Sequence, residues 1–137
     1  MGFCLDTCHL HAAGYDLTSD DSYAAVLRDF DAAVGLDRLR CLHLNDALKP
    51  LGSRVDRHTH IGDGTLGLEP FRRLMNDRRL AAVPKILETP KNGEGVEEDT
   101  RNLTTLRRLG GEPGPLPIPP VGGAVPPVEA RPKAPRP

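Results

Sequence analysis

Histidine and aspartate side chains with the spacing of metal ligands occur in two short segments of the sequence. Residues 6–9 read Asp-Thr-Cys-His, and residues 56–60 read Asp-Arg-His-Thr-His. Asp56 and His58 are two residues apart, so in an extended backbone they point to the same side and can bind one ion together. Carboxylate and imidazole ligands suit Zn²⁺, and also Mn²⁺ or Fe²⁺. The two segments therefore predict a metal centre.

Asp6 and His9 lie where an apolar segment ends, and we expect them at a junction between a strand and a loop. Since they are three residues apart, we expect them to serve neighbouring metal positions. Two metal ions about 3.5–4 Å apart can hold the attacking and leaving oxygens of a phosphodiester. A pair of ions that holds phosphodiester oxygens is therefore one chemistry that these residues can support.

Three short apolar segments are expected to be buried strands that position these groups. They cover residues 2–6, 39–44 and 83–88, and they carry Asp6, His43 and Glu88 at or near their ends. Taken singly, each has an ordinary explanation: Asp6 as a loop cap, His43 as a core histidine and Glu88 as a partner for an arginine. Their recurrence on three successive strands favours a shared site, because reactive side chains of α/β barrels lie at the carboxyl ends of strands.

Helices are predicted between and after these strands. Ser19 and Asp20 have the character of a helix start with Gly35 as its end, and Glu69-Pro70 opens a second helix. A third helix is expected over about residues 95–109, and about residues 47–66 are expected to form a functional loop. The order β-α-β-α-β-α predicts an α/β fold with a parallel sheet. Three such units cannot close a barrel, which indicates part of a larger fold.

Composition excludes several classes of protein. The 137 residues carry a formal net charge of −1, which argues against binding of nucleic acid by bulk positive charge. No apolar run reaches about 18 residues, so no membrane span is predicted. The three cysteines, Cys4, Cys8 and Cys41, follow no secretory signal, which favours buried free thiols in the cytoplasm. Ten of the 14 prolines fall in residues 112–137, which predicts a disordered Pro-rich tail.

Four strings resemble the motifs of the bacterial endonuclease IV family of apurinic/apyrimidinic endonucleases. They cover residues 2–9, 42–46, 52–58 and 86–89, in the family's order and spacing. The string Ser-Arg-Val-Asp-Arg-His at residues 53–58 is the longest and most specific part. The resemblance implies a (β/α)8 TIM barrel with three zinc ions at the carboxyl ends of its strands. It also implies base excision repair, in which the phosphodiester 5′ to an abasic site in DNA is hydrolysed to leave a 3′-hydroxyl.

The resemblance also implies roles for individual residues. Six match metal ligands of the family: Asp6, His43 and Glu88 for one zinc, and His9, Asp56 and His58 for another. The second of these sets is complete in this chain, and the first is partial. His11 and His60 match no ligand position, and Arg57 is the candidate for contact with DNA phosphate.

Members of that family are roughly twice as long as this chain, and the part without a counterpart is N-terminal. Residues 1–111 are therefore predicted to be about the last three βα units of the barrel. We expect such an N-terminally truncated chain to have little activity alone, and the full-length enzyme to be a cytoplasmic monomer.

Two alternatives stay open. Sugar isomerases and epimerases on the same barrel fold also place Asp, His and Glu around a divalent metal at strand ends, although the number of candidate ligands here favours the nuclease. The chain can instead be a non-catalytic truncated fragment whose tail is bound by polyproline-recognising domains.

Overall fold

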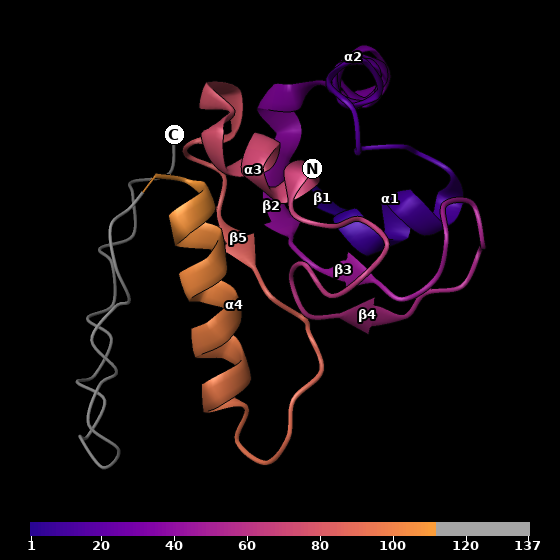
Figure 1. Cartoon of the computed structure of the whole chain (residues 1–137). Coiled ribbons are helices and arrows are strands. Elements are labelled where there is room, and N and C mark those ends of the chain that lie inside the picture. The colour runs from indigo at the N-terminus through magenta and orange to yellow at the C-terminus, as the bar shows by residue number, and fades with distance from the viewer. Residues whose placement is uncertain (112–137) are drawn as a thin grey trace.

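The chain forms an α/β structure on a parallel sheet (Figure 1). The computed structural model describes residues 1–111, and the predicted disordered tail at residues 112–137 lies outside the described residues. The sheet contains β1 (Phe3–Asp6), β2 (Leu39–His43) and β5 (Lys85–Ile86), in the order β1-β2-β5. Both pairings are parallel, which confirms the predicted α/β class and brings the carboxyl ends of the strands to one edge.

Three helices lie where caps and apolar spacing predict them. They are α2 (Asp20–Val34), α3 (Glu69–Asn76) and α4 (Val96–Leu109). Ser19 caps the first of these, because its Oγ accepts a hydrogen bond from the backbone N–H of Ser22 at 3.1 Å. Pro70 lies in the first turn of α3, where its missing N–H costs no helical hydrogen bond. Gly110 forms the carboxyl cap of α4.

The core lies where the sheet meets the helices, and short 3-10 helices lead into two of the strands. These are η1 (Leu36–Arg38) before β2 and η2 (Arg78–Leu80) before β5. Leu42, Leu44 and Phe71 are almost completely buried. Burial of each such side chain contributes about 1.5–3 kcal/mol. This packing fixes the strand ends that carry the candidate ligands.

The residues after β1 form a helix where a loop was predicted. α1 (Thr7–Ala13) begins at the strand end, because Asp6 accepts hydrogen bonds from the backbone N–H groups of Cys8 and His9. Gly14 ends this helix with a left-handed φ of 99°. The prediction of a strand-to-loop junction was therefore wrong. A helix of seven residues is too short to show clear hydrophobic periodicity in the sequence.

The segment predicted as a long loop, residues 47–66, contains strand pairing. β3 (Asp46–Ala47) pairs with β4 (His58–Thr59) in an antiparallel arrangement. A backbone hydrogen bond of 2.9 Å from Leu48 N to Arg57 O continues this pairing. The segment therefore folds back on itself and returns His58 to the edge of the main sheet.

β5 is shorter than the strand predicted over residues 83–88. Pro84 has no N–H to donate to the sheet. The N–H of Glu88 donates instead to Asn45 Oδ1 at 2.8 Å, so the strand pairing stops. Glu88 consequently lies two residues beyond the strand.

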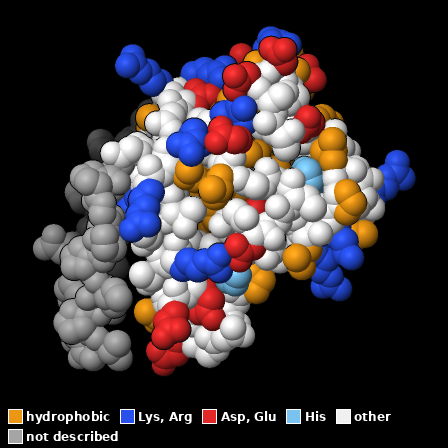
Figure 2. All heavy atoms as spheres, viewed as in Figure 1, with side chains coloured by type: hydrophobic (Ala, Val, Ile, Leu, Met, Phe, Trp, Pro, Cys, Tyr) orange, Lys and Arg blue, Asp and Glu red, His pale blue; other side chains and the backbone are white. Residues whose placement is uncertain are grey.

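Charged side chains of both signs are scattered over the face shown in Figure 2. This distribution agrees with the nearly neutral net charge. Within residues 1–111, no helix has the length and apolar character needed to cross a membrane.

Candidate metal centre

Asp6 is the central carboxylate of the site and is 6% exposed. Its Oδ1 caps α1, accepting from the backbone N–H groups of Cys8 at 2.8 Å and His9 at 3.1 Å. Its Oδ2 accepts from Asn45 Nδ2 at 2.9 Å. The cap uses Oδ1, so Oδ2 is the atom that faces the neighbouring histidines.

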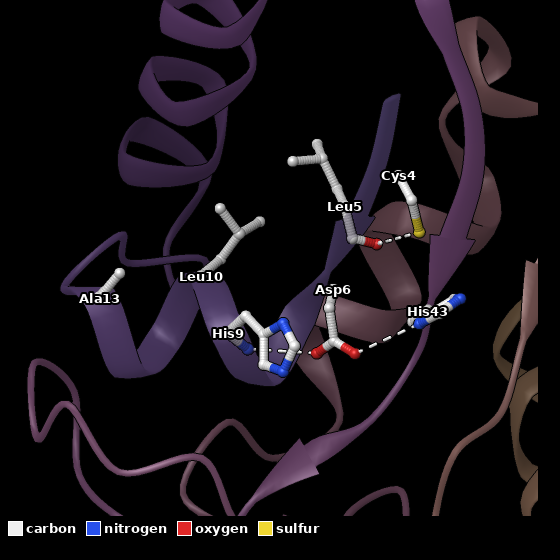
Figure 3. Close-up of a pocket in the computed structure, with 7 residues that line it drawn as sticks. All are labelled: Cys4, Leu5, Asp6, His9, Leu10, Ala13 and His43. Carbon is white, nitrogen blue, oxygen red and sulfur yellow. Dashed lines mark hydrogen bonds and ion pairs between the residues drawn. The ribbon is translucent and has the colours of Figure 1, made fainter. Parts of the chain in front are cut away.

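The first cluster joins the ends of the three parallel strands. His43 Nδ1 lies 3.6 Å from Asp6 Oδ2 and 3.0 Å from Glu88 Oε2. One ligand atom from each of these residues lies within 4.8 Å of the other two. Figure 3 shows His43 and His9 on either side of Asp6. The three residues predicted to share one metal are therefore close together.

The second cluster is centred on Asp56. His9 Nε2 lies 2.9 Å from Asp56 Oδ2, and His58 Nε2 lies 3.0 Å from Asp56 Oδ1. His58 Nε2 also lies 3.8 Å from Asp6 Oδ2. The structure thus brings the second predicted set together, and Asp6 is next to both clusters.

The hydrogen bonding of His58 provides a test of whether these residues fit a metal ion. Its Nδ1 lies 3.0 Å from the carbonyl oxygen of Glu88, which can only accept, so Nδ1 carries a proton and donates it. Its Nε2 is buried and has no hydrogen-bond partner within residues 1–111. In the neutral ring, Nε2 presents a lone pair to the carboxylates of Asp56 and Asp6. A cation placed between these atoms removes their mutual repulsion, so the donor set fits a metal ion.

In the second cluster, His9 and Asp56 shift each other's pKa in the direction that favours both charges. Burial opposes a charge on His9, but the hydrogen bond to Asp56 and the nearby carboxylates of Asp6 and Glu88 raise the pKa of His9 overall. Burial likewise opposes a charge on Asp56, but the hydrogen bonds from His9 and Cys8 help to lower the pKa of Asp56 overall. The second cluster therefore keeps a negative carboxylate between two imidazoles.

The cysteines near the site differ in exposure. Cys8 is buried, and burial raises its pKa to about 11, so it stays a neutral thiol that donates to Asp56 Oδ1 at 3.5 Å. Cys4 is exposed and Cys41 is partly exposed. The expectation of buried cysteines is confirmed for Cys8 and wrong for Cys4, because β1 lies at an edge of the sheet.

Asn45 was not among the predicted site residues, yet it connects two of them. It is fully buried, donates from Nδ2 to Asp6 Oδ2 at 2.9 Å, and accepts from Glu88 N at 2.8 Å. Thr7 Oγ1 also donates to the carbonyl oxygen of Asn45 at 2.6 Å. The signal in the sequence was the polar pair that follows the second strand, residues 45–46.

Asp46 organises the segment that follows β4. This fully buried carboxylate accepts hydrogen bonds from the backbone N–H groups of four residues: Ala47, Gly62, Gly64 and Leu66. A Cβ on Gly64 would overlap the Asp46 carboxylate, so the close approach requires glycine. Asp46 thereby holds the chain beyond His58 against β3.

The remaining histidines and the candidate arginine lie outside both clusters. His11 Nε2 lies 2.9 Å from Thr65 Oγ1, and Asn102 Nδ2 donates to His60 Nδ1 at 3.0 Å. Burial lowers the pKa of His11. Arg57 is exposed and follows Asp56 directly. Its side chain is therefore accessible to a partner of the site.

A cleft of about 470 Å³ opens beside the first cluster. Figure 3 shows the residues that line it: Cys4, Leu5, Asp6, His9, Leu10, Ala13 and His43. One wall is apolar and the other carries candidate ligands. The cleft therefore gives access from solvent to Asp6, His9 and His43.

Comparisons with known proteins agree on one family. Residues 1–106 match the family described as xylose isomerase-like TIM barrel. A "Probable endonuclease 4" of Geobacter sulfurreducens is 66% identical over 106 residues, which are 77% of this chain and 36% of that protein. Another from Chloroflexus aggregans is 56% identical over 109 residues, which are 80% of this chain and 38% of that protein.

A solved structure gives the same result. The crystal structure of endonuclease IV from Thermus thermophilus matches with a TM-score of 0.69 and 47% identity, over 80% of this chain and 38% of that one. The chain thus spans less than two fifths of the length of these relatives. By sequence and by fold, this chain belongs to the xylose isomerase-like TIM barrel family and, within it, to the endonuclease IV proteins.

Proposed function

We propose that this chain is the C-terminal portion of a zinc-dependent endonuclease of base excision repair. The proposed reaction is hydrolysis of the phosphodiester 5′ to an abasic site in DNA. The observation that carries the proposal is the pair of adjacent clusters at the strand ends, with Asp6 Oδ2 beside both. The relatives named "Probable endonuclease 4" support the nuclease over a sugar isomerase or epimerase on the same fold.

Two sets of residues are proposed to hold zinc. Asp6, His43 and Glu88 form one set, and His9, Asp56 and His58 form the other. When bound, zinc supplies Lewis acidity, which lowers the pKa of a water and neutralises charge on a leaving oxygen. Both sets combine imidazole nitrogen with carboxylate oxygen, as expected for this metal.

The residues of this chain orient the donors before any ion binds. Asn45 and the α1 backbone fix both oxygens of Asp6. The Glu88 carbonyl holds the ring of His58 with Nε2 toward the carboxylates. This preorganisation reduces the free energy that ordering of the ligands costs on binding. Arg57, exposed beside Asp56, is proposed to contact a DNA phosphate.

The remaining ligands and barrel strands are proposed to come from chain that this sequence does not include. Residues 1–111 then represent about the last three βα units, and we expect little incision by this chain alone. Cytoplasmic location and a monomeric full-length enzyme stay predictions.

The test compares this chain alone with the same chain fused to the part of the Geobacter sulfurreducens relative that it does not match. We expect the fusion to contain zinc and to incise a duplex with one abasic site, and a chelator to abolish incision. Asp56→Asn in the fusion should lower incision at least about 100-fold, whereas Asp29→Asn, an exposed change on α2, should leave it unchanged. Incision that resists chelation, or ketose isomerisation without incision, would contradict the proposal.

A further inference from the structure

Two thiols lie close in sequence to candidate ligands on neighbouring strands. Cys4 is two residues before Asp6, and Cys41 is two residues before His43. In the parallel pairing of β1 with β2, Cys4 is the register partner of Cys41, and Asp6 is the partner of His43. Residues two apart in a strand share a face. The two cysteines therefore lie on the same face of the sheet as the first cluster.

The sulfur atoms are close to each other and to His43. One ligand atom from each of Cys4, Cys41 and His43 lies within 4.8 Å of the other two. Both thiols are free, Cys4 is exposed and Cys41 is partly exposed. Cys4 also lines the cleft of Figure 3, which gives an ion a path to this position.

We propose that Cys4, Cys41 and His43 form a site for a soft, thiophilic divalent ion, for which Cd²⁺ is the probe. Two thiolates and one imidazole are a soft donor set, unlike the carboxylate-rich clusters beside it. Binding releases the two thiol protons to solvent as the ion takes their place. His43 belongs to this group and to the first cluster, so the two candidate sites share its imidazole.

The geometry favours an ion over a disulfide between these cysteines. Neighbouring strands are about 4.8 Å apart, and side chains in register point the same way, so their Cβ atoms stay near this separation. A disulfide needs Cβ atoms about 3.8 Å apart. An ion with metal–sulfur bonds of about 2.3 Å or longer spans sulfurs that remain on their own strands.

The test titrates the 137-residue chain with Cd²⁺ and follows thiolate-to-cadmium charge-transfer absorption in the ultraviolet. We expect Cys4→Ser and Cys41→Ser each to weaken this binding at least about tenfold, since each removes one of two thiolates. Cys8→Ser is the matched control and should retain the binding, because Cys8 lies with Asp56 and His58 in a separate group that offers only one thiol. Loss of the absorption in Cys8→Ser alone would overturn the proposal.

A second measurement uses the unmodified chain and so does not depend on the folding of a variant. One equivalent of Cd²⁺ should protect Cys4 and Cys41 together from alkylation by a maleimide, as read by mass spectrometry of the peptides. Unchanged alkylation of both cysteines would contradict the site. Neither readout depends on nuclease activity, so the result is independent of the proposed function.

Discussion

At the scale of single residues, Asn45 is the side chain on which the arrangement of the first cluster depends. It contacts Asp6 through its Nδ2 and the backbone of Glu88 through its Oδ1. These partners lie on β1 and just beyond β5, so Asn45, two residues after the end of β2, connects the two strands that flank β2. A residue that bonds to ligands in this way sets their orientation and thereby their affinity for metal.

Replacing Asn45 by Ala should weaken zinc binding about 10–100-fold, because Asp6 Oδ2 and Glu88 lose a common anchor. The free energy of unfolding should fall by about 1–3 kcal/mol, since buried polar groups lose their partners. Competition with a chromophoric chelator measures the affinity, and urea unfolding measures the stability. Asn92→Ala, a change in an exposed loop, is the control. Equal zinc affinity in both variants would show that Asn45 does not position the ligands.

At the scale of elements, backbone packing around Asp46 determines where His58 lies. The Asp46 carboxylate binds the backbone of the segment after β4, and Gly64 lies against it without space for a side chain. Gly67, in the same segment, has a φ of 70° and no atom within 4 Å of the position of a Cβ. The two glycines thus separate the effect of a steric overlap from that of backbone strain.

Gly64→Ala should displace this segment and weaken zinc binding, because the new methyl group overlaps the Asp46 carboxylate. Gly67→Ala should cost only about 1 kcal/mol of stability, from the positive φ, and should leave zinc affinity unchanged. Calorimetric titration with Zn²⁺ compares the variants. Similar affinity in the two would show that the packing at Gly64 does not control the site.

Asp77 links α2 to η2 and gives the fold a sensitivity to acid. Arg79 Nε donates to its Oδ1 at 2.9 Å, and Tyr23 donates to its Oδ2 at 2.9 Å. The hydrogen bond from Arg79 is the main reason that the pKa of Asp77 is lowered, against the effect of burial. Because the folded pKa lies below the unfolded value of about 4, this stabilisation is present above pH 4 and is lost as the pH falls through the folded pKa.

Asp77→Asn should therefore reduce the free energy of unfolding at neutral pH by about 1–2 kcal/mol. It should also flatten the decline in stability between about pH 5 and pH 2, since the group that gains a proton on unfolding is gone. Urea unfolding at several pH values tests both effects. The exposed Asp29→Asn serves as control, and an unchanged acid slope in Asp77→Asn would contradict the assignment.

At the scale of the whole molecule, both edges of the three-stranded sheet are open within residues 1–111. β1 forms one edge, with Cys4 exposed, and β5 forms the other, where Ile86 is 48% exposed. An edge strand presents unpaired backbone groups to any partner strand. These open edges agree with the match of this chain to less than two fifths of the length of its relatives.

If the remaining strands cover β1, Cys4 should be alkylated more slowly in the fusion described above than in the chain alone. Mass spectrometry of maleimide-treated peptides gives the rate for each cysteine. Cys8, buried in the chain, should react slowly in both and provides an internal reference. Equal rates for Cys4 in the two proteins would indicate that this edge stays uncovered.

The sequence predicted the elements that have local signals and missed those that depend on distant partners. Ser19 as a cap and the apolar spacing of α2 were sufficient to locate that helix. β3 and β4 have two residues each, too few for a periodic pattern. Asn45 contacts Asp6 and Glu88, which are 39 and 43 residues away in the chain, so its role follows only from the folded structure.

The divided use of the Asp6 carboxylate has a consequence for genetics. One of its oxygens starts a helix, and the other faces the candidate metal positions. Asn in its place would keep a helix cap but would present an amide donor to the donor of Asn45. Any inherited change at this codon is therefore expected to affect folding and ligation together, and a null allele here cannot by itself reveal which of the two was lost.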